Sequence, residues 1–256
     1  MRKRAWVVSV AAACTAVLCV LGAIFLLPSV HVSRETSVAK AAAPAPVPAQ
    51  AEPVTPTPPT LGEQLGLTAS DWRLVLVNRE HITPEMNPQV TVINNRCSVD
   101  SRIAADLDAF LAAAQQVAPA AHLISCYRSV AYQTNLFEMY VQQELEAHPG
   151  WTRDQAETQV KTYSQPAGAS EHQTGLAVDL STIEHLNEQP EATARAIQSL
   201  APQYGFILRF PQGKVESTGV EYEDWHFRFV GHEAAQYITQ NGLSLEEFLD
   251  RLEKKM

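Results

Sequence analysis

Basic residues are scarce in this chain of 256 residues, in which 19 lysines and arginines stand against 28 aspartates and glutamates, for a net charge of −9. Three of the basic residues are Arg2, Lys3 and Arg4, so the chain that follows them carries −12. An acidic body argues against nucleic acid as a partner, because phosphate backbones are bound by clustered lysines and arginines. It also argues against a domain that adheres to anionic lipid, so any membrane contact is expected at the N-terminus.

Long uncharged apolar runs are missing from the chain except over residues 5–27, directly after the basic cluster. Such a run can cross a hydrocarbon core of about 30 Å as a helix, whereas the apolar part of a cleaved secretory signal has only about 7–15 residues. We therefore predict an uncleaved single-pass membrane anchor over residues 1–31, with cleavage near residues 39–43 as the alternative. The basic cluster predicts a cytoplasmic N-terminus and a body on the outer face of the cell membrane, in the cell envelope.

Cysteine is limited to four residues. Cys14 and Cys19 lie in the apolar run, where neither follows the leucine-containing motif that precedes a lipid-modified cysteine, and we interpret both as apolar helix residues. Cys97 and Cys126 are the only pair in the remaining sequence. An oxidising exterior permits a disulfide, and closing a loop of about 30 residues contributes ~3 kcal/mol to stability. We predict a Cys97–Cys126 disulfide, with two buried thiols as the alternative.

Large apolar residues are also few from about residue 31 to residue 60, where alanine and proline dominate. A segment of this composition cannot bury enough surface to offset its ordering entropy, so we expect a semi-extended spacer. We assign residues 32–66 to this linker and residues 67–256 to one globular domain, for which the length suffices. Ser37 and Lys40 form a Ser-x-x-Lys match, but no flanking helix or cleft could position the serine, and we give it no catalytic role.

The domain sequence alternates between strand and helix patterns. The expected strands span residues 72–78, 90–93, 122–126, 176–180, 206–210 and 224–230. The expected helices span residues 100–117, 130–146, 152–163, 191–204, 233–240 and 245–254. Strands and helices interleave irregularly, which favours a compact α+β domain, with a small and mostly antiparallel sheet flanked by helices, over a doubly wound fold.

The helical His-Glu-x-x-His motif of many zinc peptidases is absent, but another set of ligand-type residues is present. His172 and Asp179 lie seven residues apart, and Glu223-Asp-Trp-His226 follows about 45 residues later. A mononuclear hydrolytic zinc site needs three protein ligands, an open position for water and a carboxylate beside the metal. We predict that His172, Asp179 and His226 bind one zinc ion per chain and that Glu223 is the base.

The spacing within this set places demands on the backbone. Gly175 permits a tight bend, so a histidine in a loop and an aspartate on the following strand can converge. Glu223 and His226 are three residues apart, and in an extended segment their side chains would point to opposite faces. The prediction therefore requires a bend or bulge before Trp225.

Three separate motifs of this sequence, and their order along the chain, closely resemble those of the zinc D-alanyl-D-alanine carboxypeptidases of the VanY type. The first motif comprises Ser125, Tyr127, Arg128, Ser129 and Gln133. The second comprises Ser170, His172, Gly175, Ala177 and Asp179, and the third comprises Glu223, Trp225 and His226. Residues 205–209, between the second and third motifs, also match the family. The likeness spans about residues 72–243 and leaves out the anchor and the spacer. Two departures are Cys126, where the family usually has glycine, and Ala167-Gly168-Ala169, where it has Pro-Gly-Tyr.

The resemblance implies a zinc carboxypeptidase domain over residues 67–256, with the same three zinc ligands and Glu223 as catalytic base. It also implies that Arg128 faces the scissile carbonyl of the substrate and that Ser170 and Gln133 help to hold the C-terminal end of the peptide. The implied substrate is a peptidoglycan stem peptide ending in D-Ala-D-Ala, cut by a D,D-carboxypeptidase. The alternatives are an L,D-carboxypeptidase that trims tetrapeptides, an endopeptidase that cuts cross-bridges, and a catalytically silent domain that binds wall peptide.

Overall fold

A four-stranded antiparallel sheet, in the order β3-β4-β6-β5, forms the centre of the fold. Its strands are β3 (His122–Ser125), β4 (Ala177–Ser181), β5 (Phe206–Leu208) and β6 (His226–Phe229). A second antiparallel pair consists of β1 (Val90–Val92) and β2 (Ser98–Asp100). The α+β class predicted from the sequence is therefore confirmed.

The computed structural model describes residues 59–185 and 187–254. The predicted anchor, the Ser-x-x-Lys match and most of the predicted linker lie outside these residues. Within them, no helix combines the length and the apolar character needed to cross a membrane.

The two faces of the central sheet differ in character, because successive side chains on a strand point to opposite faces. Val178, Leu180, Phe227 and Phe229 belong to the larger hydrophobic core. Phe110 of helix α2 (Ala104–Val117) packs on that face, with its ring centroid 5.1 Å from that of Phe227. The intervening residues of β4 and β6, which include the predicted ligands on these strands, point to the other face.

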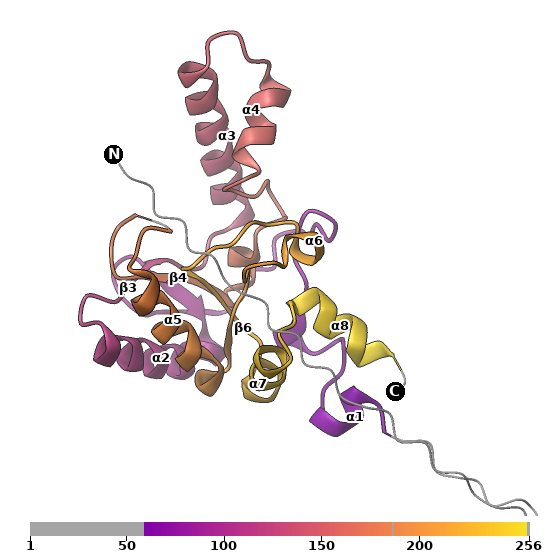
Figure 1. Ribbon diagram of the computed structural model, residues 1–256. Coiled ribbons are helices and arrows are strands. Elements are labelled where there is room, and N and C mark those ends of the chain that lie inside the picture. The colour runs from indigo at the N-terminus through magenta and orange to yellow at the C-terminus, as the bar shows by residue number, and fades with distance from the viewer. Residues whose placement is uncertain (1–58, 186, 255–256) are drawn as a thin grey trace, which may run out of the picture. The chain divides into compact units, whose positions relative to one another are not determined.

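Helices surround the sheet (Figure 1). They are α1 (Leu61–Leu65), α2 (Ala104–Val117), α3 (Val130–Ala147), α4 (Arg153–Val160), α5 (Glu191–Leu200), α6 (Val215–Thr218), α7 (His232–Gln240) and α8 (Leu245–Glu253). Short 3-10 helices are η1 (Trp72–Leu74), η2 (Ser101–Ile103), η3 (Glu171–Thr174) and η4 (Ala201–Tyr204). A second hydrophobic cluster joins α1, α7 and α8, with Leu61 and Phe248 buried in it.

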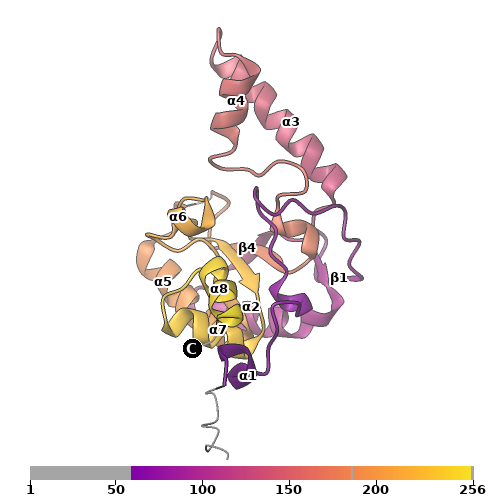
Figure 2. The ribbon, with the colours of Figure 1, turned by 90° about the vertical axis from the view of Figure 1, so that its right-hand side faces the viewer.

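Helices α3 and α4 lie side by side and project away from the sheets, as both ribbon views show (Figures 1 and 2). This hairpin has its own small hydrophobic cluster, formed by Phe137, Val141, Ala156 and Val160. At its base, Ser129 caps α3 and the backbone N–H of Val130 donates to the Glu85 carboxylate at 2.6 Å. The hairpin is thus an arm whose packing is largely its own.

The structure departs from the sequence predictions in several places. The expected strand at residues 72–78 is wrong: the segment begins with η1, because Asp71 accepts a hydrogen bond from the backbone N–H of Arg73 at 3.0 Å. Strand β2 was not predicted. Helix α1 lies inside the range assigned to the linker, and its first residue, Leu61, is buried.

The Cys97–Cys126 disulfide is present, with 5.2 Å between the two Cα atoms. Both cysteines are buried. Cys97 immediately precedes β2 and Cys126 immediately follows β3, so the bridge ties the two sheets together. It thereby fixes the backbone that leads into Tyr127 and Arg128.

Candidate metal centre

The pairing of β4 with β6 brings two of the predicted ligands together. Asp179 lies directly opposite His226 in the antiparallel register, and directly opposed residues present their side chains on the same face of a sheet. One carboxylate oxygen of Asp179, Oδ1, is 3.1 Å from Nδ1 of His226. Two segments about 45 residues apart in sequence therefore meet at one point.

His172 reaches the same point from η3. Gly175, with a φ of 71°, ends this turn in the left-handed region and lets the chain enter β4. The Nδ1 atom of His172 is 2.6 Å from the carbonyl oxygen of Cys126, which can only accept a hydrogen bond, so Nδ1 carries the proton. The Nε2 atom is then free as a ligand, and it lies 3.3 Å from Oδ2 of Asp179.

His172, Asp179 and His226 form a buried cluster whose ligand atoms all lie within 4.8 Å of one another. The two imidazole rings are perpendicular, with centroids 5.0 Å apart. Within the described part of the chain, Oδ1 of Asp179 is buried without a hydrogen-bond partner. Two imidazoles and a carboxylate are a donor set that suits zinc, and the residues present therefore fit this metal.

The protonation states of two of these groups favour metal binding. Burial would raise the pKa of Asp179, but the adjacent His172 and His226 outweigh burial and hold that pKa below its ordinary value. Burial and the nearby Arg128 lower the pKa of His172. An ionised carboxylate and a neutral imidazole are the forms that bind a metal. For His226, burial would lower the pKa, but the adjacent carboxylates of Asp179, Glu171 and Glu223 outweigh burial and raise the pKa to about 9.

Glu223 lies just before β6, and the chain bends at residues 224–225, as the predicted geometry required. Its Oε2 is 3.8 Å from Nδ1 of His226, and the residue lies outside the three-ligand cluster. Burial, more than any other influence, raises the pKa of Glu223 to about 7, although His226 acts in the opposite direction. A carboxyl group that can gain and lose a proton near neutral pH therefore stands beside the ligands.

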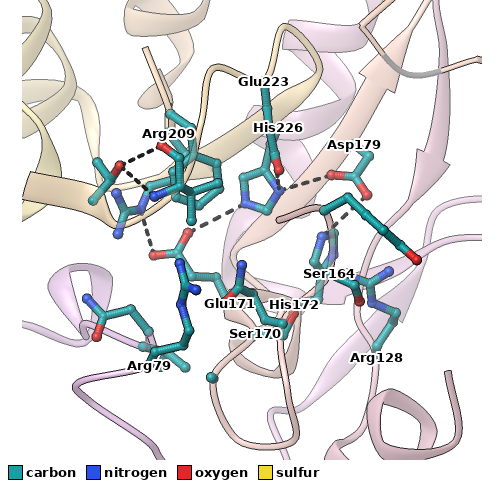
Figure 3. A pocket seen from close by; sticks show the side chains of 18 of the residues that line it. Arg79, Arg128, Ser164, Ser170, Glu171, His172, Asp179, Arg209, Glu223 and His226 are labelled. Carbon is teal, nitrogen blue, oxygen red and sulfur yellow. Dashed lines mark hydrogen bonds and ion pairs between the residues drawn. The ribbon is translucent and has the colours of Figure 1, made fainter. Parts of the chain in front are cut away.

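A cavity opens over the cluster, and Arg128 and Ser170 line it together with the three ligands and Glu223. Figure 3 shows Arg128 on the His172 side of this cavity. The backbone N–H of Arg128 donates to the carbonyl of His172 at 3.2 Å. Its side-chain Nε is buried and has no hydrogen-bond partner among residues 59–185 and 187–254.

The remaining predicted site residue, Gln133, lies behind the cavity wall. It is 1% exposed, and its amide nitrogen donates to the carbonyl of Gln165 at 2.6 Å and to Oγ of Ser164 at 3.3 Å. Ser164 and Gln165 line the cavity themselves. Gln133 thus contacts the wall of the cavity.

A group of buried charges beside the ligands was not predicted from the sequence. Glu171, Arg209 and Arg228 are each no more than 4% exposed, and Glu246 of α8 pairs with Arg209 at 2.6 Å. One signal was present in the sequence: Arg228 lies two residues after His226 and therefore on the same face of the expected strand as this predicted ligand. A charge at an inward-facing strand position requires a buried partner.

A buried His/Asp/His cluster with a separate carboxyl group, on a small antiparallel sheet, is the arrangement expected of a mononuclear metallohydrolase. The model of the D-alanyl-D-alanine carboxypeptidase family VanY matches residues 96–232, just over half of the chain. The chain belongs to this family.

One curated relative is a D-alanyl-D-alanine carboxypeptidase of Enterococcus faecalis. It is 35% identical over 181 residues, which make up 70% of this chain and 66% of the relative. The matched part thus falls just short of two thirds of that protein. Separate matches to three further relatives cover 34%, 30% and 48% of those proteins.

The solved structures that are similar to this chain include the following three. The vancomycin resistance D,D-pentapeptidase VanY from a VanB-type cassette, a variant in complex with Zn(II), is 34% identical with a TM-score of 0.61, covering 70% of this chain and 99% of that one. VanYB in complex with D-alanine-D-alanine is 34% identical with a TM-score of 0.63, covering 72% and 100%. The LD-carboxypeptidase LdcB is 31% identical with a TM-score of 0.56, covering 70% and 86%.

Proposed function

We propose that this chain is a zinc-dependent D,D-carboxypeptidase that hydrolyses the terminal D-Ala-D-Ala bond of peptidoglycan stem peptides. The observation that carries the proposal is the buried His172/Asp179/His226 cluster with Glu223 beside it, in a chain of the VanY family. The zinc complex of one similar structure and the D-alanine-D-alanine complex of another support the choice of metal and substrate.

In this proposal, Nε2 of His172, Nδ1 of His226 and the carboxylate of Asp179 would hold the zinc ion. Bound zinc supplies a Lewis acid and lowers the pKa of a water molecule to about 7. The carboxylate leaves the centre with less positive charge than three histidines would. A second positive group at the reacting carbonyl is then more useful, and Arg128 can provide it.

Glu223 is the proposed general base. It takes the proton from the attacking water and later passes it to the amine of the departing D-alanine. A base works best when its pKa lies near the working pH, and burial raises the pKa of Glu223 to about 7. The group can therefore serve in both directions of proton transfer.

Arg128 is the proposed electrophile. As water adds to the scissile carbonyl, negative charge grows on the carbonyl oxygen, and a fixed guanidinium offsets it. The side chain lines the cavity, and its Nε has no hydrogen-bond partner within the described residues. No described residue competes with the substrate for this donor.

Ser170 and Gln133 are proposed to hold the C-terminal end of the peptide in different ways. Ser170 is 4% exposed and lines the cavity, so its hydroxyl can contact the peptide directly. Gln133 acts through the wall, because it fixes the positions of Ser164 and Gln165. Replacing Gln133 is therefore expected to alter substrate affinity more than the rate of the chemical step.

We also propose that residues 1–31 anchor the chain in the cell membrane, with the catalytic domain on the outer face, where peptidoglycan lies. The uncharged run at residues 5–27 behind Arg2, Lys3 and Arg4 supports this topology. The full chain should remain with membranes after alkaline extraction and be degraded by protease added from outside. A processed form that starts near residues 39–43 would refute the anchor in favour of a cleaved signal.

Mass analysis of defined muropeptides tests the reaction. The purified domain should release one D-alanine from a pentapeptide, and chelation should abolish the release. Release of D-alanine from the tetrapeptide alone would instead support an L,D-carboxypeptidase, the activity named for one similar structure. Larger fragments would indicate an endopeptidase, and binding of wall peptide without any product would indicate a silent binding domain.

A further inference from the structure

Four charged side chains form a buried cluster on the ligand side of the sheet. Oε1 of Glu171 accepts from Nε of Arg209 at 2.9 Å and from a terminal nitrogen of Arg228 at 2.6 Å. Arg209 also pairs with both oxygens of Glu246, at 2.6 and 2.9 Å. Arg228 also donates hydrogen bonds to the backbone carbonyls of Arg73, Val75 and Phe229.

Such a cluster is a poor source of stability, because removing charges from water costs about as much as their pairing returns. Its location suggests another role. Glu171 directly precedes His172 in η3, and its second oxygen, Oε2, faces Nε2 of His226 at 3.6 Å. Figure 3 shows the Glu171 carboxylate between the Arg209 guanidinium and the His226 ring.

Both facing atoms are buried, and neither has a hydrogen-bond partner within residues 59–185 and 187–254. A shift of roughly half an ångström brings them within hydrogen-bond range. A carboxylate can only accept, so it selects the ring form of His226 that carries its proton on Nε2. That form leaves the lone pair of Nδ1 directed at Asp179 and the metal position.

We infer that Glu171 is a positioning residue for His226, and that the two arginines hold its carboxylate in place for this purpose. The inference rests on the proposed function, in which His226 is a zinc ligand through Nδ1. It gives each histidine its own acceptor: the Cys126 carbonyl for His172 and the Glu171 carboxylate for His226. Supporting acceptors of this kind orient ligands, and their loss typically costs about 10–100-fold in metal affinity.

The two arginines determine which atom of residue 171 faces His226. Because both donate to Oε1, an amide placed at this position by Glu171→Gln would direct its oxygen to them. Its NH₂ group would then face Nε2 of His226 and donate to it. The ring would be driven into the opposite form, with its proton on Nδ1 and directed at the metal.

Two variants of the purified domain separate positioning from stability. Glu171→Gln and Glu246→Gln each remove one negative charge from the same cluster, but only Glu171 faces His226. Zinc affinity is measured by competition with a chromophoric chelator. We expect Glu171→Gln to bind zinc about 10–100-fold more weakly than the wild type and Glu246→Gln less than about threefold more weakly.

The ring form is read separately, from nitrogen NMR of histidine-labelled protein loaded with zinc. The wild type and Glu246→Gln should show His226 with its proton on Nε2, and Glu171→Gln should lose this signal. If Glu171→Gln does not fold, Glu171→Gln/Arg228→Gln restores the charge balance and is expected to show the same loss of affinity.

Each result either supports or overturns the positioning role of Glu171. Equal zinc affinities and an unchanged His226 signal in Glu171→Gln would overturn the positioning role while leaving the proposed function intact. Equal losses in both single variants would assign the effect to the charge cluster as a whole and would also overturn it. A wild-type domain that binds no zinc would overturn the proposed function and this inference together.

Discussion

Asp179 and His226 lie directly opposite each other on adjacent antiparallel strands, and this pairing alone places a carboxylate and an imidazole 3.1 Å apart. The contact depends on the register of two central strands, so it is as rigid as the sheet itself. A one-residue slip of either strand would turn the ligand on that strand to the apolar face and separate the pair.

Asp179→Asn tests this contact. The variant keeps the shape of the side chain but loses the charge that zinc requires. Zinc affinity should fall by more than the roughly 10–100-fold typical of a lost supporting hydrogen bond. Metal content after dialysis checks the result, with Asp100→Asn, a buried aspartate outside the cluster, as the control that retains zinc. A fully loaded Asp179→Asn protein would contradict the assignment.

Glu223→Gln separates chemistry from metal binding. Glu223 lies outside the ligand cluster, so the variant should keep its zinc while kcat falls by about 10²–10⁴-fold. Parallel measurement of zinc content and of D-alanine release from a pentapeptide checks both points. Unchanged hydrolysis at normal zinc content would remove Glu223 from the mechanism.

Loss of the disulfide should affect both stability and the metal centre. Cys97→Ser/Cys126→Ser frees a chain loop closed by residues 29 apart, and the free energy of unfolding should drop by ~2–4 kcal/mol. The backbone carbonyl of residue 126 accepts a hydrogen bond from His172. Without the bridge this carbonyl is held less firmly, so zinc affinity should weaken. Denaturant unfolding and chelator competition measure the two effects. A variant as stable as the wild type would show that the bridge does not limit unfolding.

Asp100 should make the domain sensitive to acid. Burial alone would raise the pKa of Asp100, but hydrogen bonds from Arg102 outweigh it and hold that pKa below its ordinary value. A lowered pKa in the folded state gives stability that is present above about pH 4 and is lost as the pH falls through the folded value.

The corresponding variant is Asp100→Asn. Its free energy of unfolding should be lower than that of the wild type at neutral pH, and the difference should shrink below about pH 4. Denaturant unfolding across this pH range measures it. Asp108→Asn, at an exposed position of α2, is the matched control. If the free energies of unfolding of Asp100→Asn and the wild type differed by the same amount at all pH values, the Asp100 carboxyl would not be the source of the acid sensitivity.

Much of the fold could be predicted because its signals are local, whereas the three-ligand cluster was predicted from motifs that resemble those of a known family. Helix α3 follows a regular apolar spacing, and the His172 to Asp179 segment holds two ligands within one turn and one strand. The bend at residues 224–225 followed from the spacing of Glu223 and His226 together with the requirement that both side chains reach the same metal.

The missed features depend on contacts between distant segments. Arg228 and Glu171 are 57 residues apart, and no spacing rule links a charge in a strand to one in a loop. Gln133 belonged to a motif of the right order, yet only the fold shows that its amide contacts the carbonyl of Gln165. The strand expected at residues 72–78 failed because one side chain, Asp71, stabilises a helical turn that the apolar pattern does not reveal.

The arm formed by α3 and α4 has a hydrophobic cluster separate from the two that hold the sheet and the C-terminal helices. It nevertheless supplies part of the cavity lining, through Leu136 and Tyr140. Local unfolding of the arm can therefore precede global unfolding, since a small cluster opens at lower free energy than a large core. Substitutions in the arm can accordingly change which peptides fit while the strand register that positions the ligands stays the same, so substrate preference and metal binding can evolve independently in this chain.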